Sequence, residues 1–201
     1  MQYIPGLQII TEYIDKTEEH SLIARIDRQP WLSDMQRRVQ HYGFRYDYKR
    51  HSIDLSMHLG NLPVWSQPLA ESLHDNGFIA EVPDQLIVNE YLPGQGISPH
   101  VDCEPCFGET IISLSLGSSC VMELSHLHSN TKMLFFLRRR SLLVLSGEAR
   151  YDWKHGIPPR KSDVIDGRII PRQRRISMTF RNVILEETPV IEDHSRQRIP
   201  G

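Results

Sequence analysis

The sequence predicts an α+β fold whose core is a β-sandwich or jelly roll. Helical patterns are confined to the chain before residue 80, and from Asp84 onward short apolar runs alternate with turn residues. Helices followed by many short strands are typical of this class. A chain of 201 residues, 39% of them hydrophobic, is long enough to bury one core. We therefore expect a single domain over residues 1–185 and a polar C-terminal tail over residues 186–201.

Two helices are expected near the N-terminus. The first covers residues 15–27, because Asp15 with Glu18 three positions later forms a capping box and apolar residues follow at helical spacing. The second covers residues 68–76 and ends at Gly77, which is a common helix terminator.

Strand candidates follow from Asp84 onward. Each is a short run of apolar residues bounded by turn residues. The candidates are residues 85–91, 110–116, 120–124, 132–137, 141–145 and 175–184.

The first of these strands carries polar side chains on one face. Side chains alternate between the faces of a strand, so Asn89 and Tyr91 point the same way. After the turn at residues 93–96, the same spacing places His100 and Asp102 on a common face, as two ligands of one metal ion require.

The last strand has a denser polar stripe. Arg175, Ser177, Thr179 and Arg181 share one face, opposite three large apolar residues. One interpretation is a half-buried strand with a solvated face. The other is a stripe that faces the inside of a barrel and binds an anion, because a guanidinium group donates two parallel hydrogen bonds to a carboxylate.

A metal motif is formed by His100, Asp102 and the later His155. Two imidazoles and one carboxylate can occupy one face of Fe(II) and leave three positions for a co-substrate and oxygen. A His-x-Asp pair alone is a weak signal in a chain with ten histidines and 25 acidic residues. The motif becomes specific only in combination with the residues on either side of it in the sequence.

Four motifs in the same order resemble the AlkB family of 2-oxoglutarate- and Fe(II)-dependent dioxygenases. They span about residues 35–185 and are most similar to the AlkB-like domain of the tRNA wobble-uridine hydroxylases. The motifs are Asn89-Glu90-Tyr91, His100-x-Asp102, His155-Gly156-Ile157 and Arg175-x-x-x-Thr179-Phe180-Arg181. In one respect the chain departs from those hydroxylases, since residues 182–201 lack the zinc-binding cysteine cluster that they carry there.

The resemblance implies a double-stranded β-helix core of the jelly-roll or cupin type, with N-terminal helices packed on one sheet. It implies that Fe(II) is held by His100, Asp102 and His155, and that O2 and the co-substrate 2-oxoglutarate, which yields succinate and CO2, are consumed. It also implies that 2-oxoglutarate is bound by a second set, with the two arginines facing its two carboxylates. That set is Asn89, Tyr91, Arg175, Thr179 and Arg181.

Substrate-binding candidates are Arg45, Tyr46, Tyr48 and Glu104. The first three lie in residues 37–51, where cations alternate with aromatic rings that could stack on an extruded base. The family places a nucleotide-recognition lid at about residues 37–60, whereas the plain alternative is a solvated amphipathic hairpin. Glu104 would read a base edge or would be an ordinary acid of a surface loop.

The remaining motifs favour structural interpretations. Cys103 and Cys106 with the histidines at 126 and 128 could bind zinc, but the His-x-His spacing argues against it, and the missing βαβ context argues against a redox-active pair. Those histidines are expected to be exposed, and Cys120 to be a buried apolar residue. The arginines at 138–140 are expected in a solvated turn.

Composition limits the location and the partners. The net charge of −2 gives no global basic field, so an argument for nucleic acid must be local. Three cysteines do not indicate a secreted disulfide scaffold, and neither a signal peptide nor a membrane-spanning run is present. We expect a cytoplasmic monomer that acts on nucleic acid.

The function predicted from the sequence is oxidation of a modified or alkylated nucleobase in RNA or DNA. Oxidative demethylation and stable hydroxylation both remain open. Two alternatives from other classes are an oxygenase of a protein or small molecule, and a catalytically silent barrel that binds nucleic acid.

Overall fold

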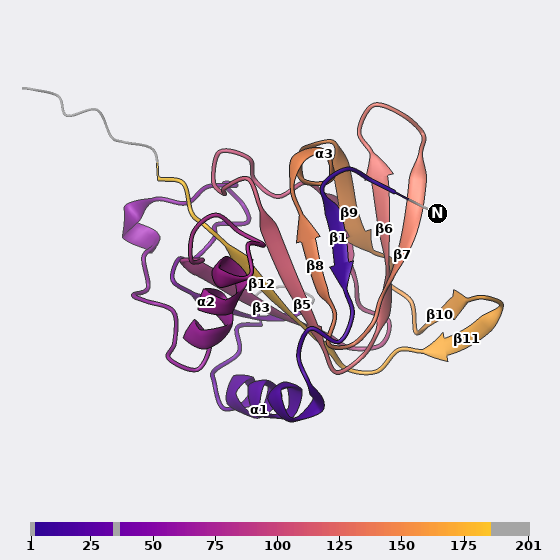
Figure 1. The fold of residues 1–201 in the computed structure, drawn as a ribbon, viewed down its shortest axis with the longest axis horizontal. Coiled ribbons are helices and arrows are strands. Elements are labelled where there is room, and N and C mark those ends of the chain that lie inside the picture. The colour runs from indigo at the N-terminus through magenta and orange to yellow at the C-terminus, as the bar shows by residue number, and fades with distance from the viewer. Residues whose placement is uncertain (1–2, 34–36, 186–201) are drawn as a thin grey trace, which may run out of the picture.

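The computed structural model describes residues 3–33 and 37–185. The expected tail at 186–201 lies outside these residues. Two antiparallel sheets form the core, and a small hairpin projects from it (Figure 1). The major sheet has the order β1-β8-β5-β12-β3-β2, and the minor sheet has the order β4-β9-β6-β7. This confirms the expected α+β jelly-roll architecture.

The bounds of the elements are as follows. The major sheet consists of β1 Leu7–Ile10, β8 Leu142–Leu145, β5 Ile111–Leu116, β12 Arg175–Arg181, β3 Gln85–Tyr91 and β2 Arg38–Tyr42. The minor sheet consists of β4 Ile97–His100, β9 Trp153–Ile157, β6 Cys120–His126 and β7 Lys132–Leu137, and the projecting hairpin of β10 Ser162–Ile165 and β11 Arg168–Pro171. The helices are α1 Lys16–Asp27, α2 Gln67–Asp75, α3 Gly147–Tyr151 and the 3-10 turn Leu55–Met57.

Helices α1 and α2 cover the outer face of the major sheet (Figure 1). The Asp15 side chain accepts hydrogen bonds from the backbone of Thr17 and Glu18, and the Glu18 carboxylate accepts one from the Asp15 backbone N–H, which is the expected capping box. Helix α2 ends before Gly77, whose φ of 72° suits glycine. Both helix predictions are confirmed.

The major sheet lies between two apolar clusters. On β12, Ile176, Met178 and Phe180 pack toward the helices in one apolar cluster. The alternate residues face the space between the two sheets, where Arg175 and Arg181 are only 3% and 8% exposed. The solvated-face interpretation of this stripe is therefore wrong, because the second sheet covers it.

The expected turn at residues 138–140 is present and Arg138 is exposed, but the expectation of a solvated side chain is wrong for Arg140. Glu19 of α1 is fully buried, accepts the backbone N–H of Gly117 at 2.8 Å and forms ion pairs with Arg139 and Arg140. Arg140 is 7% exposed and also binds Glu12. These arginines fasten the first helix to the sheet, and their charge is satisfied inside the fold.

Strands β1, β2, β4, β9, β10 and β11 were not among the expected strands. They are four or five residues long, and several include charged residues or proline that break the apolar pattern. Strand β2 shows that residues 38–42 belong to the edge of the major sheet, so the segment that leaves the sheet begins at residue 43. We call residues 43–60 the lid loop. Within residues 3–33 and 37–185, none of the helices has the length and apolar character to span a membrane.

Candidate active site

The three expected metal ligands converge on one point. His100 ends β4 and is the cross-strand partner of His155 in β9, while Asp102 follows two residues after His100. Their ligand atoms all lie within 4.8 Å of one another. The strands approach closely because residue 156 is glycine: a Cβ atom there would lie 2.9 Å from the Pro99 nitrogen. The alternation rule placed the pair correctly, although Asp102 lies beyond the end of the strand.

The protonation states of Asp102 and His155 suit the binding of a metal ion. Burial opposes ionisation of Asp102, but Arg181, His155 and His100 hold the pKa of this carboxyl well below its ordinary value. Burial lowers the pKa of His155 to about 4, although Asp102 acts in the opposite direction. An ionised carboxylate and a neutral imidazole are the forms that bind metals. The Nδ1 atom of His100 lies 2.8 Å from the Ser98 carbonyl oxygen, which only accepts, so Nε2 is left for a metal.

The buried Oδ2 atom of Asp102 indicates whether the residues present can hold an iron ion. Asp102 is 7% exposed, and its Oδ1 accepts from Arg181 at 2.6 Å. Its Oδ2 has no hydrogen-bond partner among residues 3–33 and 37–185 and lies 3.4 Å from His155 Nε2. A buried carboxylate oxygen without a partner is costly unless a cation binds it. The residues present therefore fit a divalent metal ion.

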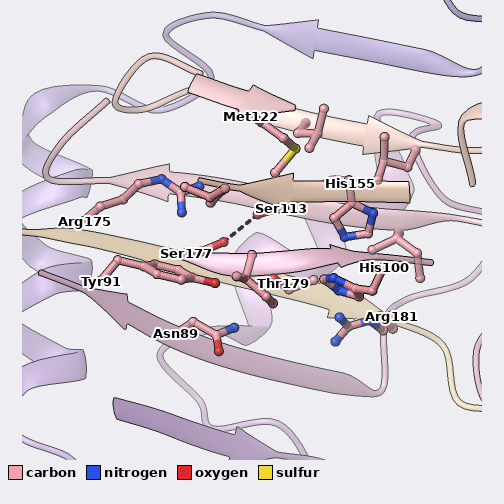
Figure 2. Close-up of a pocket in the computed structure, with 15 residues that line it drawn as sticks. Asn89, Tyr91, His100, Ser113, Met122, His155, Arg175, Ser177, Thr179 and Arg181 are labelled. Atoms are coloured by element: carbon pink, nitrogen blue, oxygen red, sulfur yellow. Dashed lines mark hydrogen bonds between the residues drawn. The ribbon is translucent and has the colours of Figure 1, made fainter. Parts of the chain in front are cut away.

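Beside the three metal ligands lies a cavity between the sheets, which we call the inner cavity (Figure 2). Arg175 donates from Nη2 to Ser115 at 2.8 Å, whereas its buried Nε and Nη1 have no partner in the part of the chain that the structure describes. Buried guanidinium donors without a partner are costly unless an anion binds them. The inner cavity thus fits one end of a dicarboxylate such as 2-oxoglutarate. Its walls include all five residues that the resemblance assigns to this co-substrate, namely Asn89, Tyr91, Arg175, Thr179 and Arg181.

The two arginines of the stripe have different surroundings. Arg175 lies over the Tyr91 ring at 5.6 Å, and burial raises the pKa of that phenol, which therefore remains a hydrogen-bond donor. Arg181 instead binds Asp102 and lies over the Phe107 ring at 4.7 Å. Figure 2 shows Arg175 and Arg181 at opposite ends of the cavity, with Arg181 at the end of the metal-binding histidines.

On the other side of the metal-binding residues lies a larger cavity of about 440 Å³, which we call the outer cavity. Tyr46 and Tyr48 of the lid loop line it together with Phe107, His100 and Asp102. The Tyr46 ring lies 5.0 Å from that of Tyr48 and 5.5 Å from that of Phe107. The volume is that of an ordinary small-ligand site. Its wall is aromatic and its floor is the metal-binding cluster.

Two of the substrate candidates lie elsewhere. Arg45 and Glu104 are exposed, and neither lines the outer or the inner cavity. Each lies in a segment that contributes other residues to the cavity walls, but its own side chain lines neither cavity. Sequence spacing gives the segment and not the direction of a loop side chain.

Two arginines at the site were not named from the sequence as binding residues. Arg37 donates to the Asn89 side chain at 2.8 Å and lines the outer cavity. Arg150 is 2% exposed and donates to the backbone carbonyls of Asp102 at 2.9 Å and Cys103 at 3.3 Å. It thereby fixes the segment that we call the metal loop, residues 101–107. No residue spacing indicates this contact, since Arg150 belongs to the short helix α3.

The cysteines differ from the expectation in one respect. Cys103 and Cys106 form a disulfide, so neither sulfur is available as a zinc ligand. The sequence argument against a redox-active pair stays a prediction, because a disulfide in a tight turn does not by itself show redox activity. His128 is exposed as expected, whereas His126 is half-buried and packs on Trp153 at 5.0 Å. Cys120 is buried, as predicted.

Comparison with known families agrees with this geometry. The sequence model of the 2OG-Fe(II) oxygenase superfamily matches residues 6–181. The chain belongs to this superfamily. It is an oxidoreductase with AlkB-like relatives, and the family implies Fe(II) and 2-oxoglutarate as cofactor and co-substrate.

Similar curated proteins include uncharacterized protein L905 of Acanthamoeba polyphaga mimivirus, 41% identical over 90% of this chain and 87% of its own. The Arabidopsis thaliana alkylated DNA repair protein ALKBH8 homolog is 38% identical over 90% of this chain and 59% of its own. The Mus musculus tRNA (carboxymethyluridine(34)-5-O)-methyltransferase ALKBH8 is 38% identical over 89% of this chain. The chain spans only 30% of that mouse protein.

Solved structures share the fold. The structure of OsALKBH1 matches with a TM-score of 0.65 and 18% identity over 90% of this chain and 99% of its own. A Pseudomonas putida prolyl-4-hydroxylase matches with a TM-score of 0.56 and 12% identity over 89% of this chain and 92% of its own. At these identities the likeness concerns the jelly roll alone.

Proposed function

We propose that this oxygenase oxidises a modified or alkylated nucleobase in RNA or DNA. The outer cavity is the observation that carries the proposal. Its aromatic wall comes from Tyr46, Tyr48 and Phe107, and its floor contains His100 and Asp102. A flat heterocycle stacks on such rings whatever its sequence context, and a base that enters the cavity approaches the metal ligands. The relatives named for alkylated DNA repair and for tRNA modification support a nucleic acid as the substrate.

The protein's own contribution is binding and orientation. His100, Asp102 and His155 would hold iron, and Arg175 would bind a carboxylate of 2-oxoglutarate in the inner cavity. The bound iron and co-substrate supply the oxidising chemistry, coupled to decarboxylation of 2-oxoglutarate to succinate. Arg181 keeps Asp102 ionised and oriented through its 2.6 Å contact. The rings of the outer cavity hold the base against the reacting centre and exclude water.

A catalytically silent barrel is disfavoured by two costly features. Asp102 Oδ2 and two donors of Arg175 are buried without partners. Unpaired polar atoms of this kind destabilise a fold, and a protein that only binds nucleic acid gains nothing from them.

The deciding experiment follows succinate formation and the nucleoside products together. The protein is supplied with Fe(II), ascorbate and 2-oxoglutarate, with or without methylated oligonucleotides and bulk tRNA. We expect nucleic acid to stimulate succinate formation, and mass spectrometry of the nucleosides to reveal loss of a methyl group or gain of one oxygen. The His155→Ala variant measures oxidation by free iron. Succinate formation at the same rate with and without each nucleic acid would indicate a protein or small-molecule substrate. The absence of succinate formation would indicate a silent barrel.

A further inference from the structure

The disulfide between Cys103 and Cys106 lies next to the metal-binding cluster, and the proposed function makes no use of it. Cys103 directly follows Asp102 in the chain and lines the outer cavity. Cys106 is only 4% exposed. A reagent that enters the outer cavity therefore reaches the sulfur of Cys103 before that of Cys106.

Both sulfur atoms contact the lid loop at one backbone atom. The Sγ atoms of Cys103 and Cys106 lie 3.3 and 3.4 Å from the carbonyl oxygen of His51. His51 has a φ of 51°, a backbone conformation that is unusual for a residue other than glycine. Its ring Nδ1 lies 3.2 Å from the hydroxyl of Tyr46, which lines the outer cavity. The cysteine pair thus touches the turn of the lid loop that positions Tyr46.

Arg150 separates this contact from the metal ligand. Its guanidinium binds the carbonyl oxygens of Asp102 and Cys103 and is itself buried. These bonds involve backbone atoms and do not depend on the state of the sulfurs. A chemical change at the cysteine pair is therefore transmitted to His51 and not to the carboxylate of Asp102.

We propose that Cys103 and Cys106 form a reversible thiol–disulfide site that controls how firmly the lid loop is held over the outer cavity. In reduction, one thiolate of an external dithiol attacks the Cys103 sulfur, the bond to Cys106 breaks, and Cys106 leaves as a thiolate that takes up a proton. The second thiol of the reductant then displaces Cys103 and forms the reductant's own disulfide. Two electrons and two protons pass to the protein, and a low-molecular-weight disulfide reverses the exchange.

Whether reduction strengthens or weakens the contact with the lid loop depends on which form of the cysteine pair carries S–H hydrogens. A thiol can donate its S–H to the His51 carbonyl, whereas a disulfide sulfur has no hydrogen to donate. Reduction therefore adds a weak hydrogen bond to the turn of the lid loop, and oxidation removes it. At about 1 kcal/mol, such a bond changes the opening equilibrium of the loop about fivefold.

The first test is chemical. The full chain is equilibrated with dithiothreitol or with oxidised glutathione, labelled with a maleimide under native conditions, and digested for mass spectrometry. We expect a label on Cys103 only after reduction. Cys120 is 1% exposed and serves as the internal control that stays unlabelled in both samples. A pair with the same labelling in both samples would refute the proposal.

The second test measures the consequence and needs no nucleic acid, so its outcome is independent of the proposed substrate. Hydrogen exchange of the lid loop, for example at the amides of Arg45 and Asp47, which donate to Met57 and Ser52, is compared in the two redox states. We expect exchange about fivefold slower in the reduced protein. Mn(II) affinity, measured by calorimetry after the reagents are removed, is expected to agree within about twofold. Equal exchange in both states, or a shift in Mn(II) affinity as large as the change in exchange, would overturn the proposal.

A variant isolates the cause. In Cys103→Ser/Cys106→Ser, the redox buffers are expected to leave exchange of the lid loop unchanged, while Cys120→Ala retains the full difference. A redox response that persists in the double variant would assign the effect to another group.

Discussion

The inner and outer cavities meet at His100, but their walls are built differently. The inner cavity is lined mainly from β3, β5, β6, β8, β9 and β12, each of which is paired on both sides, and also from the edge strand β4. The outer cavity is lined by residues of the lid loop and the metal loop together with residues of β3, β4 and β12. Paired strands hold side chains in a fixed register, whereas loops tolerate substitution. The difference assigns the common chemistry to the sheet and the choice of substrate to the loops.

The largest effect is expected from substitution of His100, which lies at the boundary between the two cavities. His100→Ala removes one of three metal ligands and should abolish both Mn(II) binding and turnover, because two ligands hold a divalent metal poorly. Calorimetry and succinate formation measure the two losses. His128→Ala is the matched control, since His128 is exposed and lies outside both cavities. Normal metal affinity in His100→Ala would remove this residue from the ligand set.

A second prediction concerns the inner cavity alone. Arg175→Ala removes two unpartnered donors and should raise the KM for 2-oxoglutarate roughly 30-fold, as expected for about 2 kcal/mol from hydrogen bonds to a charged group. Steady-state kinetics with varied 2-oxoglutarate provide the measurement. Arg168→Ala, in the exposed part of the projecting hairpin, is the control. An unchanged KM would mean that the co-substrate binds elsewhere.

A third prediction concerns the residue that fixes the metal loop. Arg150→Met keeps much of the side-chain volume but removes the hydrogen bonds to Asp102 and Cys103. Metal affinity is expected to fall about tenfold, as is typical when a group that orients a ligand is lost. The KM for 2-oxoglutarate at saturating metal should stay within about twofold. A parallel rise in that KM would show that the inner cavity depends on the metal loop after all.

The same division explains what could be predicted from the sequence. The stripe from Arg175 to Arg181 and the pair Asn89 and Tyr91 follow from alternation along strands, because a buried strand leaves its side chains only two directions. Arg150 could not be found in this way, since its partners are backbone carbonyls of a loop distant in sequence. The direction of the Glu104 side chain could not be predicted for the same reason, because a loop residue has no period that sets it. The buried pairing of Arg140 with Glu19 was missed because charge alone indicates solvent, and only the fold brings helix α1 to that turn.

The smallest expected effect probes the outer cavity and separates stacking from hydrogen bonding. Burial raises the pKa of the Tyr48 phenol, so the side chain is a neutral ring with a hydroxyl, 5.0 Å from the Tyr46 ring. Tyr48→Ala should lower kcat/KM for a nucleic-acid substrate about tenfold, since stacking of one base contributes about 1–3 kcal/mol. Tyr48→Phe keeps the ring and should stay within about twofold.

Two comparisons decide whether that loss belongs to the outer cavity. Tyr3→Ala removes a tyrosine that is 73% exposed and should have no effect. The KM for 2-oxoglutarate in Tyr48→Ala should equal that of the wild type, because Tyr48 lines only the outer of the two cavities. If Tyr48→Phe lost as much as Tyr48→Ala, the hydroxyl and not the ring would recognise the substrate. If Tyr48→Ala lost nothing with any nucleic acid, the aromatic wall would not be a base-binding surface, and the loops would have to select a substrate of another kind.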